Sequence, residues 1–452
     1  MISESKPTTY VLAEVPADSP IKGYMPKGGA KELWQAHDLE VIIEGPAETG
    51  KTLAALQKID ASCWKYPEAQ WVIMRKSQRS VYESVLQTYL YKVLQSSPEA
   101  TNNPQGYVKP FGGTRPEMFT YPNGSTIWIA GMDSADKVLS SERDGIYVNQ
   151  CEELSLAEWE TLSTRVTGRA GHVTYPQLIG DCNPSSPLHW ILSRLKKGSL
   201  KLIHSSHKDN PVLWDEKAQV WTMQGRRTMQ VLEKLTGSRR SRLLQGLWMI
   251  PEGAIFSMFD ETLNKVDSFI PPHTWPRVVG VDPKGAYIGA LWGAWDQGNT
   301  HLHIFREYLQ PFGLTTQKHC ENILGLSRTE TIWRWFGGGP SERQERLDYN
   351  GHGLPLEETL VPSVWVGIDK ISELLNERVL IVHDCCVGLL SEIGTYKRTV
   401  DKMGTSTESI EYKDQFHLID ALRYLITGLT GPVDEVEVSQ IIYNPVSIGR
   451  SF

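Results

Sequence analysis

The fold of this chain is decided first by the stretch Gly45-Pro46-Ala47-Glu48-Thr49-Gly50-Lys51-Thr52. It matches the pattern G-x-x-x-x-G-K-[ST], in which glycines let backbone N–H groups surround phosphate oxygens at the start of a helix. The apolar run Val41-Ile42-Ile43 before it predicts a strand, and residues 52–56 after it predict a helix. All eight residues are therefore predicted to bind ATP, with Lys51 on the β and γ phosphates and the Thr52 hydroxyl on Mg²⁺.

Chain length, hydrophobic content and cysteine spacing limit the possible architecture of the chain. The chain has 452 residues, 40% of them hydrophobic, which is too long for one ordinary core and predicts two domains. No apolar run is long enough to span a bilayer, and residues 1–7 lack the layout of a signal peptide, so we expect no membrane association. The six cysteines show no metal-type or disulfide-type spacing, which predicts reduced thiols in an intracellular protein.

Charge differs between the two halves. Residues 1–250 carry 29 Lys+Arg against 26 Asp+Glu, a net charge of +3. Residues 251–452 carry 17 against 27, a net charge of −10. An acidic second half is what a cluster of metal-binding carboxylates would help to produce, and DNA binding does not require a basic chain if the contacts line a channel.

The first half alternates strands and helices, the α/β pattern of a mostly parallel sheet. Residues 1–27 are predicted to form a loose arm and 28–250 a P-loop domain that ends in a helical linker region. Further strands are predicted at 70–74, 146–148 and 177–179, a helix at 77–94, and a hairpin in which Pro122-Asn123-Gly124-Ser125 joins two short strands. From Leu200 to Leu247 the pattern is mainly helical and basic.

A second α/β domain is predicted from 275 to 430, after a linker at 251–274. Its strands are expected at Arg277–Asp282, on both sides of the turn Asp296-Gln297-Gly298-Asn299, and at Val379–Val382. A final helix is predicted from Phe416 to Leu429, and 431–452 as a partly ordered tail.

A P-loop ATPase also needs acids at the end of a second strand, for the Mg²⁺ shell and for the attacking water. The strand at 146–148 is followed by Asn149 and Gln150, which are amides and poor bases, and only then by Glu152 and Glu153. We therefore predict that Glu152 or Glu153 is catalytic. The alternative is that both are acids favoured by the dipole of a following helix.

Other polar residues are predicted around the nucleotide. Asn183, after the strand at 177–179, is placed to sense the γ-phosphate. Gln35, ahead of the P-loop strand, is a candidate for reading the adenine edge. The cation that phosphoryl transfer requires has five candidates, which the sequence does not rank: Arg75, Arg79, Arg143, Arg165 and Arg169.

Carboxylates in the second half have the chemistry that metal-dependent cleavage of phosphodiesters requires. Cleavage of a phosphodiester by two metal ions about 4 Å apart needs several converging carboxylates, and Mg²⁺ and Mn²⁺ prefer such oxygen ligands. Asp282 follows a buried strand, and Asp420 lies on the final helix three residues after His417, so both can face one side. Asp282 and Asp420 are predicted metal ligands and His417 a hydrogen-bonding partner. Alternatively, Asp282 is a turn residue and Asp420 only holds Arg423.

Together these motifs resemble the large terminase subunit of tailed bacteriophages. The matching segments cover about residues 28–428 in the family's order; they are Gly45–Thr52, Tyr147–Leu154 with Ser155–Trp159, Gly180–Pro184 with His189-Trp190, Gly280-Val281-Asp282 and His417–Tyr424. The resemblance implies an N-terminal ATPase domain of the additional-strand type and a C-terminal RNase H-like domain that cuts DNA with two divalent metals. Asn149-Gln150 departs from the family's pattern.

The same resemblance implies a function and its partners. The chain would move double-stranded viral DNA into a procapsid with ATP and cut concatemeric DNA with Mg²⁺ or Mn²⁺. It would act as a homo-oligomeric ring with the portal protein and the small terminase subunit, in the host bacterial cytoplasm and transiently at the portal vertex. It also places the third nuclease carboxylate near Glu342, with Asp348, Glu307 and Asp414 as alternatives.

Two other functions fit the P-loop. One is a helicase-like or recombination ATPase without nuclease activity, for which Asp282 and Asp420 would have no catalytic role. The other is a non-enzymatic nucleotide-binding module, in which Asn149 and Gln150 mark a lost hydrolytic site.

Overall fold

A computed structural model describes residues 25–94, 108–134, 140–284, 287–296, 298, 300–311, 314–359, 363–400 and 406–430. Most of the predicted arm (1–27) and all of the predicted tail (431–452) lie outside these residues. Contacts divide the chain into two compact units. The first comprises residues up to Glu153, Leu162–Asn183 and Leu200–Leu232; the second comprises Leu154–Thr161, Pro184–Ser199 and residues from Glu233 onward. The domain limits 28–250 and 275–430 stay a prediction.

The first unit is built on a mostly parallel sheet, which has eight strands in the described part of the chain. In spatial order they are β3 (Lys109–Phe111), β4 (Met118–Thr120), β5 (Thr126–Gly131), β2 (Gln70–Arg75), β6 (Gly145–Asn149), β7 (Gln177–Cys182), β1 (Glu40–Glu44) and β8 (Lys201–His204). Only β3–β4 and β4–β5 pair antiparallel, which confirms the predicted hairpin between β4 and β5.

The order of β1, β7 and β6 in the sheet agrees with the predicted additional-strand type of ATPase domain. The P-loop strand β1 does not pair with β6, which precedes the predicted acids, because β7 lies between them and pairs in parallel with both. An extra strand between these two is the defining feature of the additional-strand class named above. The carboxyl ends of β1, β6 and β7 therefore meet at one edge of the sheet.

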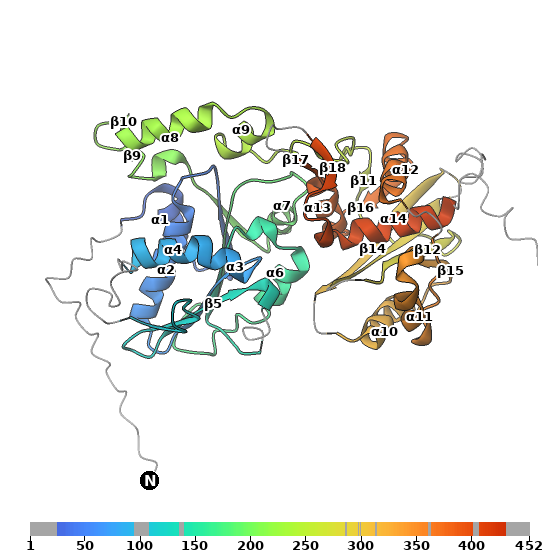
Figure 1. The fold of residues 1–452 in the computed structure, drawn as a ribbon, viewed down its shortest axis with the longest axis horizontal. Coiled ribbons are helices and arrows are strands. Elements are labelled where there is room, and N and C mark those ends of the chain that lie inside the picture. Colours follow the sequence, from blue (N-terminus) through green and yellow to red (C-terminus); the bar gives the residue numbers. More distant parts are fainter. Residues whose placement is uncertain are drawn as a thin grey trace, which may run out of the picture. The chain divides into compact units, whose positions relative to one another are not determined.

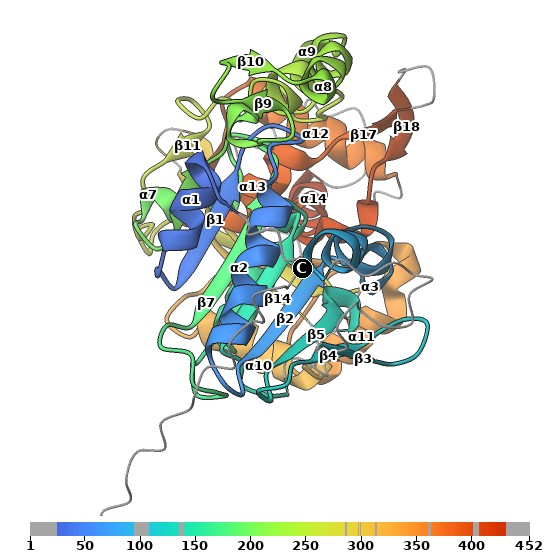
Figure 2. The same ribbon diagram turned by 90° about the vertical axis from the view of Figure 1, so that its left-hand side faces the viewer.

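Helices of the first unit pack on this sheet. Apolar side chains of α1 (Gly28–Gln35) and of α2 (Lys51–Lys65) join the core with alternate residues of the strands, and α2 lies across β7 and β2 (Figure 2). The helix predicted at 77–94 is confirmed and is partly π-helical: α3 (Gln78–Ser80), η1 (Val81–Val85), α4 (Leu86–Thr88) and η2 (Tyr89–Val93). Shorter pieces are η3 (Met132–Ser134), η4 (Cys151–Glu153) and η5 (His207–Asp209).

The prediction of a mainly helical stretch from Leu200 to Leu247 is wrong in its first part. This stretch begins with β8, an edge strand that pairs in parallel with β1, and contains the small antiparallel pair β9 (Trp214–Asp215) and β10 (Val220–Trp221). The predicted basic helices follow as α8 (Met223–Glu233) and α9 (Gly237–Leu243). An edge strand that is only partly buried lacks the long apolar run by which buried parallel strands are recognised.

The carboxylate of Asp60 should make the stability of the first unit depend on pH. The Tyr121 hydroxyl donates to Asp60 Oδ1 over 2.5 Å, and burial raises the pKa of Asp60 to about 6. Because the folded-state pKa is raised, its contribution to stability is present at low pH and is lost as pH rises through about 6. The Asp60→Asn variant should therefore gain stability relative to wild type between pH 4 and pH 8, by at most about 3 kcal/mol.

Urea unfolding of the first unit at several pH values measures this difference. Asp38→Asn, which removes an exposed carboxylate of the same unit, controls for the loss of one negative charge. Parallel stability curves for wild type and Asp60→Asn would contradict the prediction.

The second unit is built on a mixed sheet, which has six strands in the described residues. In spatial order they are β11 (Lys265–Val266), β16 (Leu380–His383), β14 (His301–Pro311), β13 (Tyr287–Asp296), β12 (Arg277–Asp282) and β15 (Ile332–Gly337). β12, β13 and β14 form an antiparallel meander, and β15 pairs in parallel with β12. This is the arrangement expected of the predicted RNase H-like domain, and the predicted α/β fold class is confirmed in both units.

Helices cover both faces of the second sheet (Figure 1). On one face α12 (Val364–Asn376), α13 (Val387–Thr395) and α14 (His417–Thr430) form a core with β12, β14 and β16. On the other face the core includes residues of α10 (Thr316–Leu326) and α11 (Arg343–Gly351). The remaining elements of this part are α6 (Leu156–Ser163), α7 (Trp190–Lys196), η6 (Pro340–Glu342), η7 (Lys413–Gln415) and the pair β17 (Arg398–Val400) and β18 (Ser406–Ile410). No described helix is both long and apolar enough to cross a membrane.

A glycine lets α14 approach the sheet beside Asp282. A Cβ at Gly280 of β12 would lie 2.3 Å from the carbonyl oxygen of Ala421 and 2.6 Å from Leu425 Cβ. Gly280→Ala should therefore destabilise the second unit by about 2–3 kcal/mol, because the helix must move away. Gly325→Ala in α10 is the control, because its Cβ would meet no atom within 4 Å and should stabilise slightly. Scanning calorimetry measures both, and equal effects of the two variants would refute the close approach.

Candidate nucleotide and metal sites

The P-loop joins β1 to α2 with two glycines in conformations that other residues disfavour. Gly50 caps α2 with φ of 89°, and a Cβ at Gly45 would lie 2.1 Å from the Ser205 carbonyl oxygen. These glycines hold the loop close to its neighbours and in front of the α2 N-terminus. The predicted segment Gly45–Thr52 is therefore placed as an anion-binding loop requires.

Lys51 lies inside this loop. Its Nζ donates to the carbonyl oxygens of Gly45 (2.9 Å) and Pro46 (2.5 Å), to Thr49 Oγ1 (3.3 Å) and to Asn183 Oδ1 (3.2 Å). Burial lowers the pKa of Lys51, although the nearby Asp181 opposes that effect. The structure thus brings the predicted residues Lys51 and Asn183 into direct contact.

A carboxylate that the sequence analysis did not select lies at the centre of the site. The Thr52 hydroxyl donates to Asp181 Oδ2 over 2.6 Å, and the Gln150 N–H donates to Asp181 Oδ1 over 3.0 Å. Asn149 Nδ2 donates to Asp181 Oδ1 (2.9 Å) and to Thr52 Oγ1 (3.2 Å). The acid beside the P-loop threonine therefore comes from β7, and the residue that ends β6 is the amide Asn149.

The two predicted glutamates have different surroundings. Glu152 Oε1 accepts the N–H of Asn183 over 3.1 Å, so it joins the group around Lys51. The residue is partly exposed but its carboxyl group is buried, and this burial raises the pKa of Glu152 to about 8. Glu153 is exposed and pairs with Arg75 over 3.3 Å. Of the two glutamates, Glu152 is therefore the one in contact with the group around Lys51.

Gln35 and the five candidate arginines lie in different surroundings. Gln35 is the exposed last residue of α1. Its contact with the adenine edge stays a prediction. Among the five arginines, Arg75 forms an ion pair with a predicted catalytic acid, Glu153. Arg79 pairs with Glu83, Arg169 with Glu142, and Arg143 donates to Gln70.

In the second unit, Asp282 ends β12 and contacts α14. His417 Nδ1 and Asp282 Oδ2 are 2.8 Å apart, which confirms His417 as a hydrogen-bonding partner. Burial, aided by the negative charge of Asp420 and opposed by the hydrogen bond with His417, raises the pKa of Asp282 to about 6. Nε2 of His417 is buried and has no hydrogen-bond partner among the described residues.

Asp420 lies on α14 one turn after His417. Arg423 donates to its Oδ1 from Nε (3.1 Å) and Nη2 (3.0 Å), so the predicted contact with Arg423 is present. The start of α14 is fixed by the buried carboxylate of Glu392, which accepts the N–H groups of Leu418 (3.2 Å) and Ile419 (2.8 Å). Glu392 therefore positions the helix turn that carries His417 and Asp420.

Glu342 follows β15, whose carboxyl end lies beside that of β12. Gly337 is paired with Val281, and a Cβ at Gly338 would lie 2.8 Å from Glu342 Cβ and 3.2 Å from Pro283 Cγ. Glu342 thus lies close to the residue that follows Asp282.

The alternatives to Glu342 are differently placed. Glu307 accepts the N–H groups of Gly388 (2.8 Å) and Leu389 (2.9 Å) at the start of α13, a structural role. Asp348 and Asp414 are exposed. Glu342 likewise accepts the N–H of Gly339 over 2.7 Å at the start of η6, so these contacts do not single out one acid and the role of Glu342 stays a prediction.

The donor set of this site fits divalent metal ions. Two carboxylates, Asp282 and Asp420, are close enough for the charge of one to raise the pKa of the other. Asp282 is buried, whereas Asp420 is partly exposed and already pairs with Arg423. Oxygen ligands of this kind suit Mg²⁺ or Mn²⁺.

Comparisons with known proteins gave structural matches alone. No family model matches the chain, and no curated protein matches its sequence. The structure is similar to the large terminase of a thermophilic bacteriophage in complex with ADP, at 18% identity and a TM-score of 0.40, over 89% of this chain and 98% of that one. It is also similar to the large terminase of bacteriophage HK97, at 11% identity and a TM-score of 0.39, over 86% and 91%. The nuclease domain of the bacteriophage SPP1 large terminase with bound Mn matches 38% of this chain and 96% of its own length, at 20% identity and a TM-score of 0.30.

Proposed function

We propose that this chain is an ATP-driven motor that moves double-stranded viral DNA into a procapsid and cuts concatemeric DNA with a divalent metal. The observation that carries the proposal is that one chain contains two separate groups of residues suited to phosphate chemistry. One is the P-loop with Thr52, Asp181 and Glu152, and the other contains Asp282 and Asp420.

In the first unit each residue has a distinct role. Lys51 neutralises charge on the transferred phosphate, and Glu152 orients and polarises the attacking water through its carboxyl oxygens. Thr52 and Asp181 would hold Mg²⁺, which when bound stabilises the charge of the phosphate oxygens. Asn183 links Lys51 to Glu152, so it is placed to report the loss of the γ-phosphate.

In the second unit Asp282, Asp420 and Glu342 would hold the metal ions. The ions would activate water and stabilise the leaving oxygen of a phosphodiester. His417 holds Asp282 through Nδ1. Contacts of the motor with DNA should be mainly to the phosphate backbone, because translocation cannot depend on sequence.

The same proposal includes partners and place of action. The chain would assemble as a homo-oligomeric ring on the portal protein, with the small terminase subunit, in the host bacterial cytoplasm. Asp181 argues against the non-enzymatic alternative, since it supplies a carboxylate where β6 ends in an amide.

Two assays on the purified chain test the function. We expect DNA-dependent ATP hydrolysis and, separately, nicking of supercoiled plasmid with Mg²⁺ or Mn²⁺ but not with EDTA. ATP hydrolysis without any metal-dependent cleavage would favour the helicase-like alternative. Tight ATP binding with negligible hydrolysis would favour the non-enzymatic module.

A further inference from the structure

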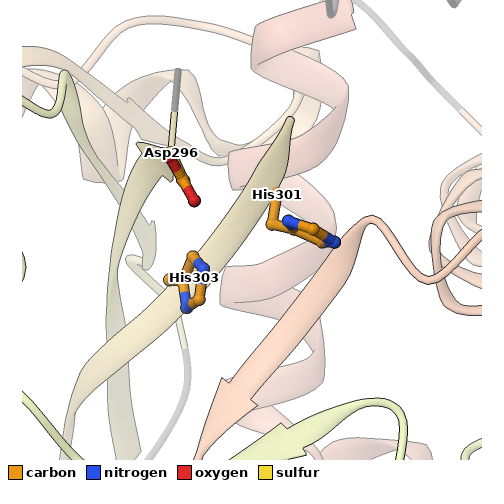
Figure 3. A group of neighbouring side chains, drawn as sticks. All are labelled: Asp296, His301 and His303. Carbon is orange, nitrogen blue, oxygen red and sulfur yellow. The ribbon is translucent and has the colours of Figure 1, made fainter. Parts of the chain in front are cut away.

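A group of three metal-binding side chains lies away from the nuclease carboxylates. Asp296 ends β13, and His301 and His303 begin β14 (Figure 3). Asp282 is paired with Gly289, seven residues before Asp296 on β13. At about 3.4 Å per residue the two groups are roughly 24 Å apart along the strand.

Strand register brings the three side chains together. Asp296 lies directly opposite His301 in the antiparallel pair, and His303 follows two residues later, so all three side chains lie on one face of the sheet. One ligand atom from each residue lies within 4.8 Å of the other two. Ligand atoms bound to one ion at about 2.1 Å are roughly 3–4 Å apart, so small changes of side-chain torsion close the site.

A fourth polar side chain, that of His383, contacts His303. His303 Nδ1 and His383 Nε2 are 3.2 Å apart. His383 is 0% exposed, and its Nδ1 has no hydrogen-bond partner among the described residues. Ligating histidines commonly use their second nitrogen in such a hydrogen bond, which fixes the ring that binds the ion.

The surroundings favour neutral imidazoles, the form that binds metals. The ring centroids of Phe269 and His383 are 4.6 Å apart, and those of Trp275 and His303 are 5.1 Å apart. Both imidazoles are buried among these aromatic rings, and a metal ion binds the neutral form of the ring.

We propose that Asp296, His301 and His303 form a binding site for a divalent transition-metal ion of the Zn²⁺ type, with His383 as a positioning residue. Two imidazoles and one carboxylate suit Zn²⁺, whereas Mg²⁺ requires oxygen ligands. The ion would join the adjacent ends of β13 and β14. This site is independent of the proposed nuclease activity.

Zn²⁺ titration of the full chain by calorimetry, with Co²⁺ absorption as a second readout, tests the site. We expect one ion per chain that excess Mg²⁺ does not displace. His301→Ala, His303→Ala and Asp296→Asn should each weaken binding at least about 10-fold, and His383→Phe about 10- to 100-fold. The chain with Asp282→Asn and Asp420→Asn should still bind this ion, which separates the site from the nuclease carboxylates.

His352→Ala is the matched control, because it removes an exposed histidine of the same unit and should leave binding unchanged. If His303→Ala does not fold, His301→Ala provides the test at a partly exposed position. No saturable Zn²⁺ binding by the folded chain would overturn the proposal. Equal binding by wild type and the three ligand variants would also overturn it.

Discussion

The Asp181→Asn substitution is expected to reduce the kcat of ATP hydrolysis by about 100-fold or more. Asp181 is the carboxylate that accepts the hydroxyl hydrogen of Thr52, the P-loop residue expected on Mg²⁺. Asparagine keeps the shape but removes the charge that a divalent cation requires. A 100-fold effect corresponds to roughly 2.7 kcal/mol of transition-state stabilisation.

A matched variant separates this effect from simple loss of stability. Asp144 is a fully buried aspartate at the opposite end of β6, where it accepts the N–H groups of Gln70 (2.8 Å) and Gly171 (3.1 Å). Asp144→Asn should therefore lower stability by about 1–3 kcal/mol but leave kcat nearly unchanged. Thermal unfolding and ATP turnover of both variants, at saturating Mg²⁺ and ATP, measure the two effects.

An exchange of the two side chains sharpens the test. Asn149 and Asp181 are paired in register on β6 and β7 and are joined by a hydrogen bond. The double variant Asn149→Asp with Asp181→Asn returns the carboxylate to β6 and should recover at least about tenfold of the lost turnover, since the charge stays beside Thr52. Full activity of Asp181→Asn alone would refute the role of Asp181.

The importance of Asp181 could not be predicted from the sequence because it depends on strand order. The P-loop, β1 and α2 follow from local patterns, and so does the strand β6. That β7 lies between β1 and β6 is a long-range fact, and only this order places Asp181 beside Thr52 and Asn149. The sequence therefore predicted the correct edge of the sheet and assigned Asn183 of the segment after β7 to it, but it did not identify Asp181 as the acid beside Thr52.

The second unit shows the same limit. The spacing of His417 and Asp420 on one helix was visible in the sequence, and so was the strand that ends at Asp282. The group of Asp296, His301 and His303 was not recognised, because it depends on the register of β13 with β14. The turn between these strands was predicted, but a turn alone does not show which residues face each other.

The second large effect is expected at the nuclease carboxylates. Asp282→Asn and Asp420→Asn should each reduce metal-dependent cleavage of supercoiled plasmid by about 100-fold or more, because each removes an oxygen ligand with a negative charge. ATP hydrolysis should be retained, since the P-loop residues belong to the other compact unit. Mn²⁺ should raise the unfolding temperature of wild type more than that of either variant.

Two further substitutions test whether Glu342 is the third metal-binding acid and provide a control. Glu342→Gln should lower cleavage strongly, because both Glu342 and Pro283, the residue after Asp282, lie next to Gly338 at the carboxyl end of β15. Asp348→Asn, an exposed acid on α11, should leave cleavage unchanged. If Asp348→Asn is the deleterious one, the assignment of Glu342 is wrong while the site itself stands. If Asp282→Asn and Asp420→Asn cleave as wild type does, the activity belongs to other residues or to a contaminant, and a P-loop ATPase without nuclease activity becomes the better account of the chain.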